Sequence, residues 1–219
     1  MKHWMMAAVL TLCGWVSALA QIDPQVTEIM RKCEKVMSNP DGLEMTMSVE
    51  ARMVIKLTGM TAIVSMKNEK SKATMVMKVL GREVRTEEGF DGTQEWSYRH
   101  IYLKKKGKEV KDTLIIKKTD KKSESDYDID FSVDKDYKTA TLKVSGRYYE
   151  LTFTNPVKKD DPKKVVVKID KDKYYFREMK ARQSGVSMTM TVTKIKFGVS
   201  DDVFKLDLSK YPNAVVVRK

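Results

Sequence analysis

Residues 43–57, Leu-Glu-Met-Thr-Met-Ser-Val-Glu-Ala-Arg-Met-Val-Ile-Lys-Leu, alternate apolar and polar side chains, and this stretch decides the fold class. Only Val54 departs from the alternation. A period of two is typical of a β-strand with one dry and one solvated face, because successive side chains point to opposite sides. A straight strand of this length would extend about 50 Å, so we expect it to bend within a curved sheet.

Shorter runs of the same kind follow along the chain, separated by turn sequences. Gly59 and Asn68–Lys72 are expected to form the first two turns, and most of the later turns contain Gly or Pro. The spacing predicts about ten antiparallel strands in a meander, without the βαβ alternation of a parallel sheet. A basic loop at 104–111 and a long polar loop at 117–128 are also expected. We predict one domain over residues 21–219.

The segment before this stretch predicts one amphipathic helix. Asp23 suits the N-cap, Pro24 suits the first turn, and Asn39-Pro40-Asp41-Gly42 ends the helix with turn residues. Apolar residues recur at helical spacing at Val26, Ile29, Met30, Cys33, Val36 and Met37. We therefore expect a mainly β protein, a curved antiparallel sheet with this helix packed on it.

Residues 1–20 have the pattern of a cleaved export signal. Lys2 and His3 precede the apolar run Trp4–Val16, and Ala18-Leu19-Ala20 places small residues at −3 and −1. Cleavage after Ala20 is expected. The alternative is a retained membrane anchor, which the run disfavours because a spanning helix needs about 20 apolar residues.

The chain is basic, with 42 Lys and Arg against 30 Asp and Glu and a net charge of +12. Its 42% hydrophobic content is sufficient for a core and argues against disorder. Lysine runs such as 104–106 mark hairpin ends and are interrupted by acids, which argues against nucleic-acid binding. We interpret them as a solvated surface, with attraction to anionic lipid head groups or an acidic partner as the alternative.

Patterns that indicate catalysis or metal binding are missing from the sequence. After residue 20 it contains one cysteine, Cys33, and one histidine, His100. Cys33 lies on the apolar stripe of the predicted helix and is expected to be buried, whereas His100 is expected to be exposed at a strand end. Nucleophile-elbow, phosphate-loop, dinucleotide and metal-ligand spacings do not occur. We predict that the protein is not an enzyme and takes no cofactor or metal.

Methionines are concentrated on the dry positions of the predicted strands. Three i, i+2 pairs each point to one side of a strand: Met45/Met47, Met75/Met77 and Met188/Met190. Methionine is flexible, so a face lined with it can adapt to ligands of varied shape. An ordinary methionine-rich core would give the same pattern, and the residues leave both readings open.

Two segments resemble the periplasmic lipoprotein carriers of the LolA type. Phe90-Asp91-Gly92-Thr93 with Trp96-Ser97-Tyr98 is similar to that family's D-G-K/T-x-x-W-x-Y hairpin. Residues 204–217, FKLDLSKYPNAVVV, are similar to its F-x-x-D-x-x-x-Y-P-x-x-x-V-x-D closure. The resemblance covers Gln21 to Val217 in outline. It implies an unclosed half β-barrel capped by helices over a hydrophobic cavity, in a periplasmic protein.

The same resemblance implies a carrier that holds the acyl chains of a lipoprotein, or lipid, and hands them toward the outer membrane. It implies an inner-membrane release complex and an outer-membrane acceptor as partners, and we expect a monomer. The residues expected to bind the lipid are Met45, Met47, Met53, Met75, Met77, Trp96, Tyr98, Met188 and Met190.

Two departures separate the chain from that family. The family has an arginine after the second strand that tethers its lid loops, and residues 66–71 here contain none. Mid-chain lid helices are also not evident in the polar stretch 104–128. The alternative function is therefore a non-enzymatic periplasmic interaction or sensor module on the same half-barrel, with a packed interior.

Overall fold

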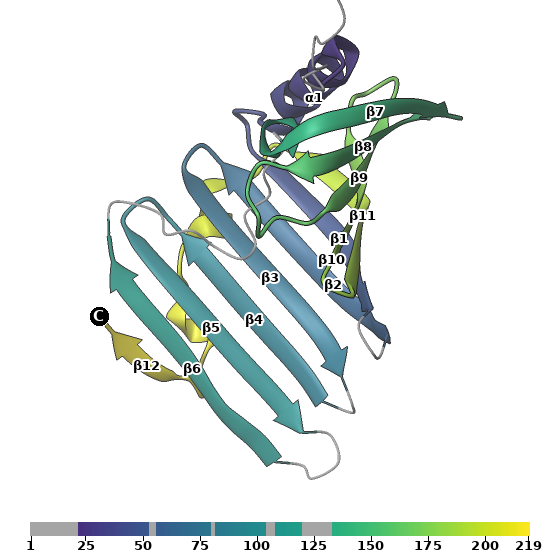
Figure 1. The fold of residues 1–219 in the computed structure, drawn as a ribbon. Helices are drawn as coiled ribbons and strands as arrows, with labels where there is room; N and C mark the ends of the chain where they lie inside the picture. Colours follow the sequence, from purple (N-terminus) through teal and green to yellow (C-terminus); the bar gives the residue numbers. More distant parts are fainter. Residues whose placement is uncertain (1–21, 53–55, 80–81, 104–107, 120–132) are drawn as a thin grey trace, which may run out of the picture.

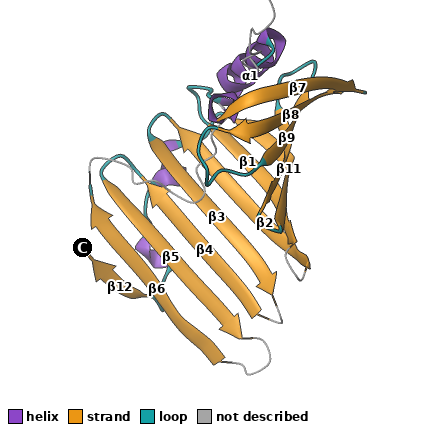
Figure 2. Cartoon of the chain, in the orientation of Figure 1, coloured by secondary structure: helices purple, strands orange, loops and turns teal. Residues whose placement is uncertain are grey.

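The computed structural model describes residues 22–52, 56–79, 82–103, 108–119 and 133–219. Within these residues it contains one α-helix and twelve strands that belong to a single sheet (Figures 1 and 2). The helix is α1 (Pro24–Met37), and three short 3-10 helices are η1 (Val133–Asp136), η2 (Asp201–Phe204) and η3 (Leu208–Lys210).

The strands form two consecutive meanders that share one sheet. The first comprises β1 (Leu43–Arg52), β2 (Lys56–Lys67), β3 (Lys70–Val79), β4 (Arg82–Phe90), β5 (Gln94–Leu103) and β6 (Lys108–Lys118). The second comprises β7 (Tyr137–Ser145), β8 (Tyr148–Pro156), β9 (Lys164–Asp170), β10 (Phe176–Gln183) and β11 (Val186–Phe197). Pairing of β1 with β11 joins them, and β12 (Val215–Arg218) adds to β6 in the parallel direction.

The sheet curves but does not close. Its strand order is β12-β6-β5-β4-β3-β2-β1-β11-β10-β9-β8-β7, so β12 and β7 are its two edges. The second meander turns across the first, which makes one face concave (Figure 1). We call this concave face, on which α1 lies, the inner face, and the opposite face the outer face.

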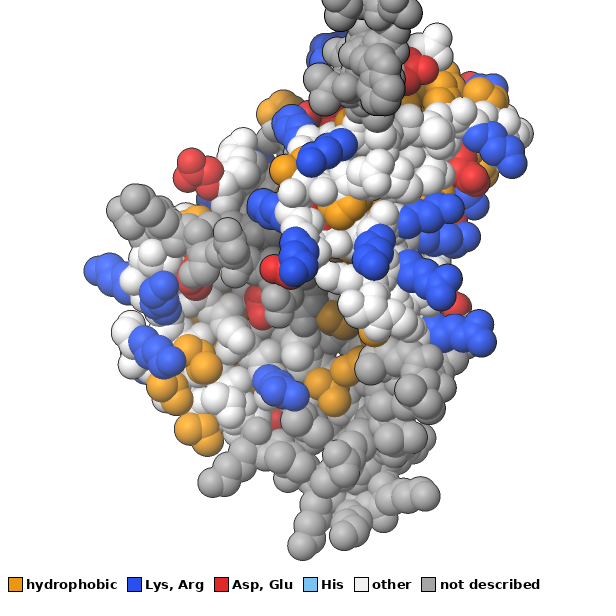
Figure 3. Space-filling model, viewed as in Figure 1, with side chains coloured by type: hydrophobic (Ala, Val, Ile, Leu, Met, Phe, Trp, Pro, Cys, Tyr) orange, Lys and Arg blue, Asp and Glu red, His pale blue; other side chains and the backbone are white. Residues whose placement is uncertain are grey.

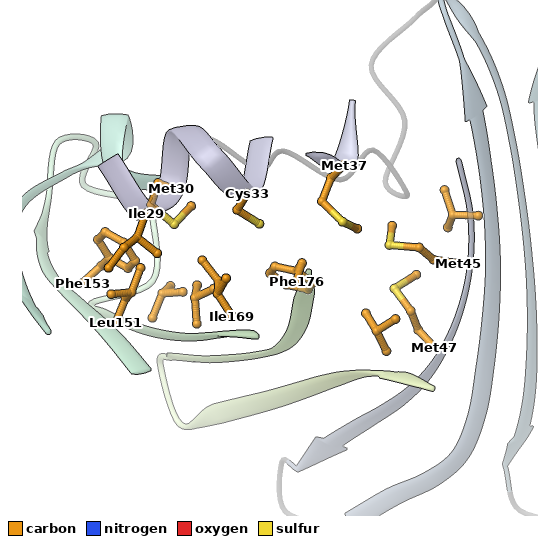
Figure 4. Packing of buried hydrophobic residues seen from close by; sticks show 14 of the residues in the cluster. Ile29, Met30, Cys33, Met37, Met45, Met47, Leu151, Phe153, Ile169 and Phe176 are labelled. Carbon is orange, nitrogen blue, oxygen red and sulfur yellow. The ribbon is translucent and has the colours of Figure 1, made fainter. Parts of the chain in front are cut away.

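Helix α1 forms as predicted and covers the inner face of the second meander. The Asp23 side chain accepts a hydrogen bond from the Gln25 backbone N–H at 2.8 Å, which caps the helix. The apolar stripe of α1 packs with the inner face into one core (Figure 4). Its fully buried members include Val26, Met30, Cys33, Met37, Met45, Leu151, Phe153, Val167 and Ile169. Burying each such side chain contributes about 1.5–3 kcal/mol, so this core holds the second meander and helix together.

The prediction of one long strand over residues 43–57 is wrong, because the stretch contains a hairpin. β1 ends at Arg52 and β2 begins at Lys56, and these two residues pair with each other. Ala51 pairs with Leu57, so the apolar residues on both strands share one face and the alternation continues across the reversal. Val54, the one break in the alternation, lies between the two strands.

Gly59 was expected to form a turn and instead lies inside β2. Its φ of +76° suits glycine, and the register between β1 and β2 shifts between Val49 and Ala51 at the same level. The glycine therefore accommodates a β-bulge, which increases local strand twist. The first turn after it is the two-residue connection Asn68-Glu69, shorter than predicted.

The runs expected to form strands did not include β4, β6, β7 or β12, and the sheet has twelve strands where about ten were expected. The expected loops at 104–111 and 117–128 are shorter than predicted, because β6 spans Lys108–Lys118. Residues 104–107 and 120–132, like the predicted export signal and Met53, lie outside the described residues. In the part of the chain that the structure describes, no helix combines the length and apolar character needed to cross a membrane.

Candidate functional site

The inner face can be followed residue by residue through the sheet register. Directly paired residues of antiparallel strands point to the same face. One row crosses the sheet from Met75 to Ala62, Met47 and Val192. The neighbouring row contains Met60, Val49, Met190, Met179, Val167 and Leu151. The inner face is therefore apolar continuously from β3 through β1 to β8.

Nine methionines lie on this face, at positions 45, 47, 60, 66, 75, 77, 179, 188 and 190. Met60, Met66 and Met179 were not among the predicted site residues. They lie on β2 and β10, and only the pairing with Val49, Leu43 and Met190 places them on this face. Met45 and Met47 are buried in the core beneath α1, close to Met37 of the helix (Figure 4). These two are consequently part of the packed interior.

The other predicted methionines keep part of their surface exposed. Met75, Met77, Met188 and Met190 are all half-buried, on either side of the fully buried pair. Figure 3 shows the molecule hollowed between its two meanders, with hydrophobic side chains inside the hollow and Lys and Arg side chains around it. The half-buried methionines thus form an adaptable apolar surface next to a rigid core.

The inner face changes character toward β4–β6. Ala73 pairs with Glu88, which pairs with Ser97, and Met75 pairs with Thr86, which pairs with Arg99. The rows of Ala73 and Met75 therefore end in polar and charged side chains, whereas the row of Met77 continues through Val84 and Ile101. An amphipathic ligand could place its apolar part over the methionines and its polar part over β4 and β5.

Trp96 and Tyr98, which were predicted to bind lipid with the methionines, lie on the outer face. Tyr98 pairs with Glu87, which pairs with Thr74, whereas the neighbouring Ser97 belongs to the inner-face row. Both aromatic side chains are buried, and they pack with Leu114, Ile116 and Tyr211 in a second core. The structure therefore brings the methionines together and places the two aromatic residues on the other side of the sheet.

The second core joins the two segments that carried the family resemblance. The ring centroids of Tyr98 and Tyr211 are 4.7 Å apart. In the hairpin segment, Asp91 accepts hydrogen bonds from the backbone N–H groups of Thr93 and Gln94 and so fixes the turn before Trp96. In the closing segment, Asp207 accepts from the Ser209 N–H and starts η3. Both motifs act in folding: the closing segment crosses the outer face and ends as β12.

Two buried carboxylates anchor this contact. The Tyr98 hydroxyl donates to Asp112 at 2.7 Å, and Nδ1 of His100 lies 2.6 Å from the same carboxylate. The Tyr211 hydroxyl donates to Glu87, which also pairs with Lys72 at 3.0 Å. The prediction that His100 is exposed at a strand end is wrong, because it lies within β5 and is largely buried beside Asp112.

The electrostatics of Glu87 make folding sensitive to acid. Burial alone would raise the pKa of Glu87, but the hydrogen bond from Tyr211 and the positive charge of Lys72 outweigh it and hold the pKa below its usual 4.5. The unfolded chain therefore binds this proton at a higher pH than the folded chain does. The stabilisation is complete above about pH 4.5 and is lost as the pH falls through the folded-state pKa.

We expect the melting temperature to fall as the pH is lowered below about 4.5, and the Glu87→Gln variant to show a shallower fall. The variant cannot release a proton at this position, so its unfolding is less linked to pH. Thermal unfolding followed by circular dichroism between about pH 7 and pH 3 measures both slopes. Identical slopes for the two proteins would assign the acid sensitivity to other carboxylates.

Cys33 is buried as predicted, and burial raises the pKa of its thiol to about 12. The neutral thiol is a poor nucleophile at physiological pH, and the side chain belongs to the core beneath α1. Among the described residues there is also no group of three or more His, Cys, Asp or Glu side chains that could hold a metal ion.

Comparison with known proteins finds similarity at the level of structure. The chain is similar to LprF from Mycobacterium bovis, with 12% identity, a TM-score of 0.47, and coverage of 82% of this chain and 96% of that one. It is also similar to a LolA superfamily protein from Nitrosomonas europaea, with 10% identity, a TM-score of 0.35 and coverage of 82% and 97%. A third is MucB in complex with MucA(peri), with 11% identity, a TM-score of 0.35 and coverage of 82% and 59%. No protein-family model matches the sequence, and no curated protein matches it.

Proposed function

We propose that the protein is a non-enzymatic periplasmic carrier that binds acyl chains of lipoproteins, or of lipid, on its inner face and hands them toward the outer membrane. The observation that carries the proposal is the set of half-buried methionines on β3 and β11, which continue the apolar rows of the core along the inner face. The two sequence motifs similar to LolA-type carriers also support it.

The energetics suit such a ligand. Each buried methylene contributes about 0.8 kcal/mol, so an acyl chain of about 16 carbons gains on the order of 10 kcal/mol before the costs of binding. No covalent step is needed for capture or release. Transfer requires an acceptor that binds the chains more tightly than the carrier does, because a carrier can only follow differential affinity.

Carboxylates placed on the half-buried part of the inner face are expected to weaken acyl-chain binding strongly. In the Met75→Asp/Met188→Asp variant, an acyl chain would have to cover two charged groups, which costs on the order of 100-fold in affinity. Native mass spectrometry and lipid extraction of the purified protein would detect co-purified acylated peptide or phospholipid. A fluorescent fatty acid would measure the affinity directly.

The matched control is Ile63→Asp/Val157→Asp, which adds the same charge at exposed positions away from the inner face. Ile63 is 41% exposed and belongs to an outer-face row, and Val157 is 56% exposed after β8. This control should bind like the unmodified chain, and circular dichroism should show that both variants are folded. An unmodified protein that carries no lipid and takes up none would contradict the proposal and favour the interaction module with a packed interior.

A further inference from the structure

Tyrosines and cations alternate around the turn between β9 and β10. Tyr174 and Tyr175 lie in this turn, and Tyr148 and Tyr149 lie beside it at the start of β8. The rings of Tyr149 and Tyr174 are 6.2 Å apart. All four tyrosines are half-buried. Tyr148 and Tyr149 are consecutive in β8 and point to opposite sides of it, so the rings lie on both sides of this end of the sheet. Together with the cations described next, they form what we call the tyrosine–cation cluster.

Four cationic groups contact these rings. From the charged atom to the ring centroid, Lys32 of α1 lies 5.1 Å from Tyr174, and Arg147 lies 5.6 Å from Tyr148. Lys173 and Arg177 lie 5.8 Å and 5.4 Å from Tyr175. Such contacts hold a positive charge against an aromatic face without neutralising it. The cluster therefore presents aromatic surface and positive charge together.

Nearby acids are fewer than the cations, and two of them have internal partners. Glu28 pairs with Lys32 at 2.9 Å along α1. Asp170 is fully buried, pairs with Arg147 at 2.8 Å and accepts hydrogen bonds from the backbone N–H groups of Asp172 and Lys173. In the same turn Lys171 offsets Asp172, so Lys173 and Arg177 leave the cluster with a net positive charge.

The turn is built to hold this arrangement. The Tyr174 backbone N–H donates to the Asp170 carbonyl at 2.9 Å, and the Asp170 N–H donates to the Tyr175 carbonyl at the same distance. Tyr174 adopts a φ of +55°, a left-handed conformation that is uncommon for an aromatic residue. The buried carboxylate of Asp170 fixes the turn in spite of this strain. Tyr149, Tyr174 and Tyr175 also pack against the core beneath α1, so the cluster is an ordered part of the fold.

We propose that the tyrosine–cation cluster docks the protein on the surface of a bilayer that contains anionic phospholipid. Tyrosine prefers the membrane–water interface because its ring is apolar and its hydroxyl is polar. Lysine and arginine beside it are attracted to the negative surface potential of such a bilayer. The positive charge and half-buried rings complement a lipid surface, which demands no shaped pocket. This inference concerns where the protein is held, and it goes beyond the ligand that it carries.

The test measures binding of the full chain to vesicles of phosphatidylcholine with and without phosphatidylglycerol. We expect binding to the anionic vesicles only, and weaker binding at high salt because screening shortens the range of the attraction. The Lys171→Gln/Lys173→Gln/Arg177→Gln variant removes three cations and leaves the Arg147–Asp170 pair intact. Its affinity for anionic vesicles should fall on the order of 100-fold.

A matched control separates the cluster from the overall charge of the chain. The Lys117→Gln/Lys118→Gln/Lys210→Gln variant loses the same charge from exposed positions on β6 and η3, in the other half of the molecule. It should bind anionic vesicles far more strongly than the cluster variant. Equal losses in both variants, equal binding to neutral vesicles, or binding only to an acidic polypeptide would overturn the proposal. Uptake of a fluorescent fatty acid should be unchanged in the cluster variant, so this test is independent of the acyl-chain proposal.

Discussion

Replacement of Phe204 by alanine is expected to lower the free energy of unfolding by about 3–5 kcal/mol, although the residue lies in a short 3-10 helix after the last long strand. Phe204 is fully buried, at the point where η2 packs against β3 on the way across the outer face. The loss combines transfer of a large ring to water with the cavity left behind. Urea unfolding followed by circular dichroism would measure it.

The control for this prediction lies in the same 3-10 helix. Asp201 is 54% exposed and forms ion pairs with Lys67 at 3.4 Å and Lys70 at 3.0 Å. Exposed ion pairs contribute little because water and salt screen them, so Asp201→Ala should change the unfolding free energy far less than Phe204→Ala. If Asp201→Ala were the more damaging variant, charge rather than apolar burial would attach the C-terminal segment to the sheet.

The position of Phe204 helps to explain the resemblance to the LolA-type carriers. The closing segment similar to the LolA-type motif begins at Phe204 and includes Tyr211, which contacts Tyr98 of the other motif. Both segments therefore meet on the outer face, opposite the surface proposed to bind acyl chains. The residues that are similar to the family belong to the packed outer face, and the surface proposed to bind acyl chains is formed by alternating methionines that no motif describes.

The alternation of apolar residues predicted much of the fold, because a half-buried strand has a period of two wherever it occurs. The same regularity concealed the hairpin between Arg52 and Lys56. Apolar residues stay at odd-numbered positions through the reversal, as the pair Ala51 and Leu57 shows, so the sequence pattern does not change there. Strand β4 was missed for the opposite reason. Its sequence, REVRTEEGF, carries polar residues on both faces, and the buried Glu87 that pairs with Lys72 is not recognisable without its partner.

The candidate site was only partly predictable for a related reason. The alternation of side chains along one strand shows that Trp96 and Tyr98 share a face of β5. It does not show whether Met75 of β3 lies on the same face of the sheet. This assignment depends on the register across β3, β4 and β5 and on the C-terminal segment that covers the outer face. Long-range packing sets both, and neither leaves a local pattern in the sequence.

The contact between Gly89 and Trp96 gives the second large expected effect. These residues pair across β4 and β5, and the indole ring lies directly over the glycine. A Cβ atom at position 89 would lie 2.1 Å from Cζ2 of Trp96. Trp96 is only 2% exposed beneath the Tyr211 segment, so the ring cannot move without disturbing the second core. We expect Gly89→Ala to destabilise the protein by about 2 kcal/mol.

Whether Gly89→Ala destabilises or stabilises the protein should depend on the presence of the Trp96 ring. In a Trp96→Ala background the space over position 89 is free, and alanine should then be neutral or stabilise by about 0.5 kcal/mol, because glycine loses more backbone entropy on folding. A double-mutant cycle by urea unfolding measures the coupling between the two positions. Trp96 is also the only tryptophan after residue 20, so in the chain lacking residues 1–20 its fluorescence reports directly on this core, and Gly89→Ala should shift the emission to the red. Additive losses in the cycle, with an unshifted emission, would mean that the glycine is required for its backbone conformation, whereas coupling would show that it is required to seat the tryptophan.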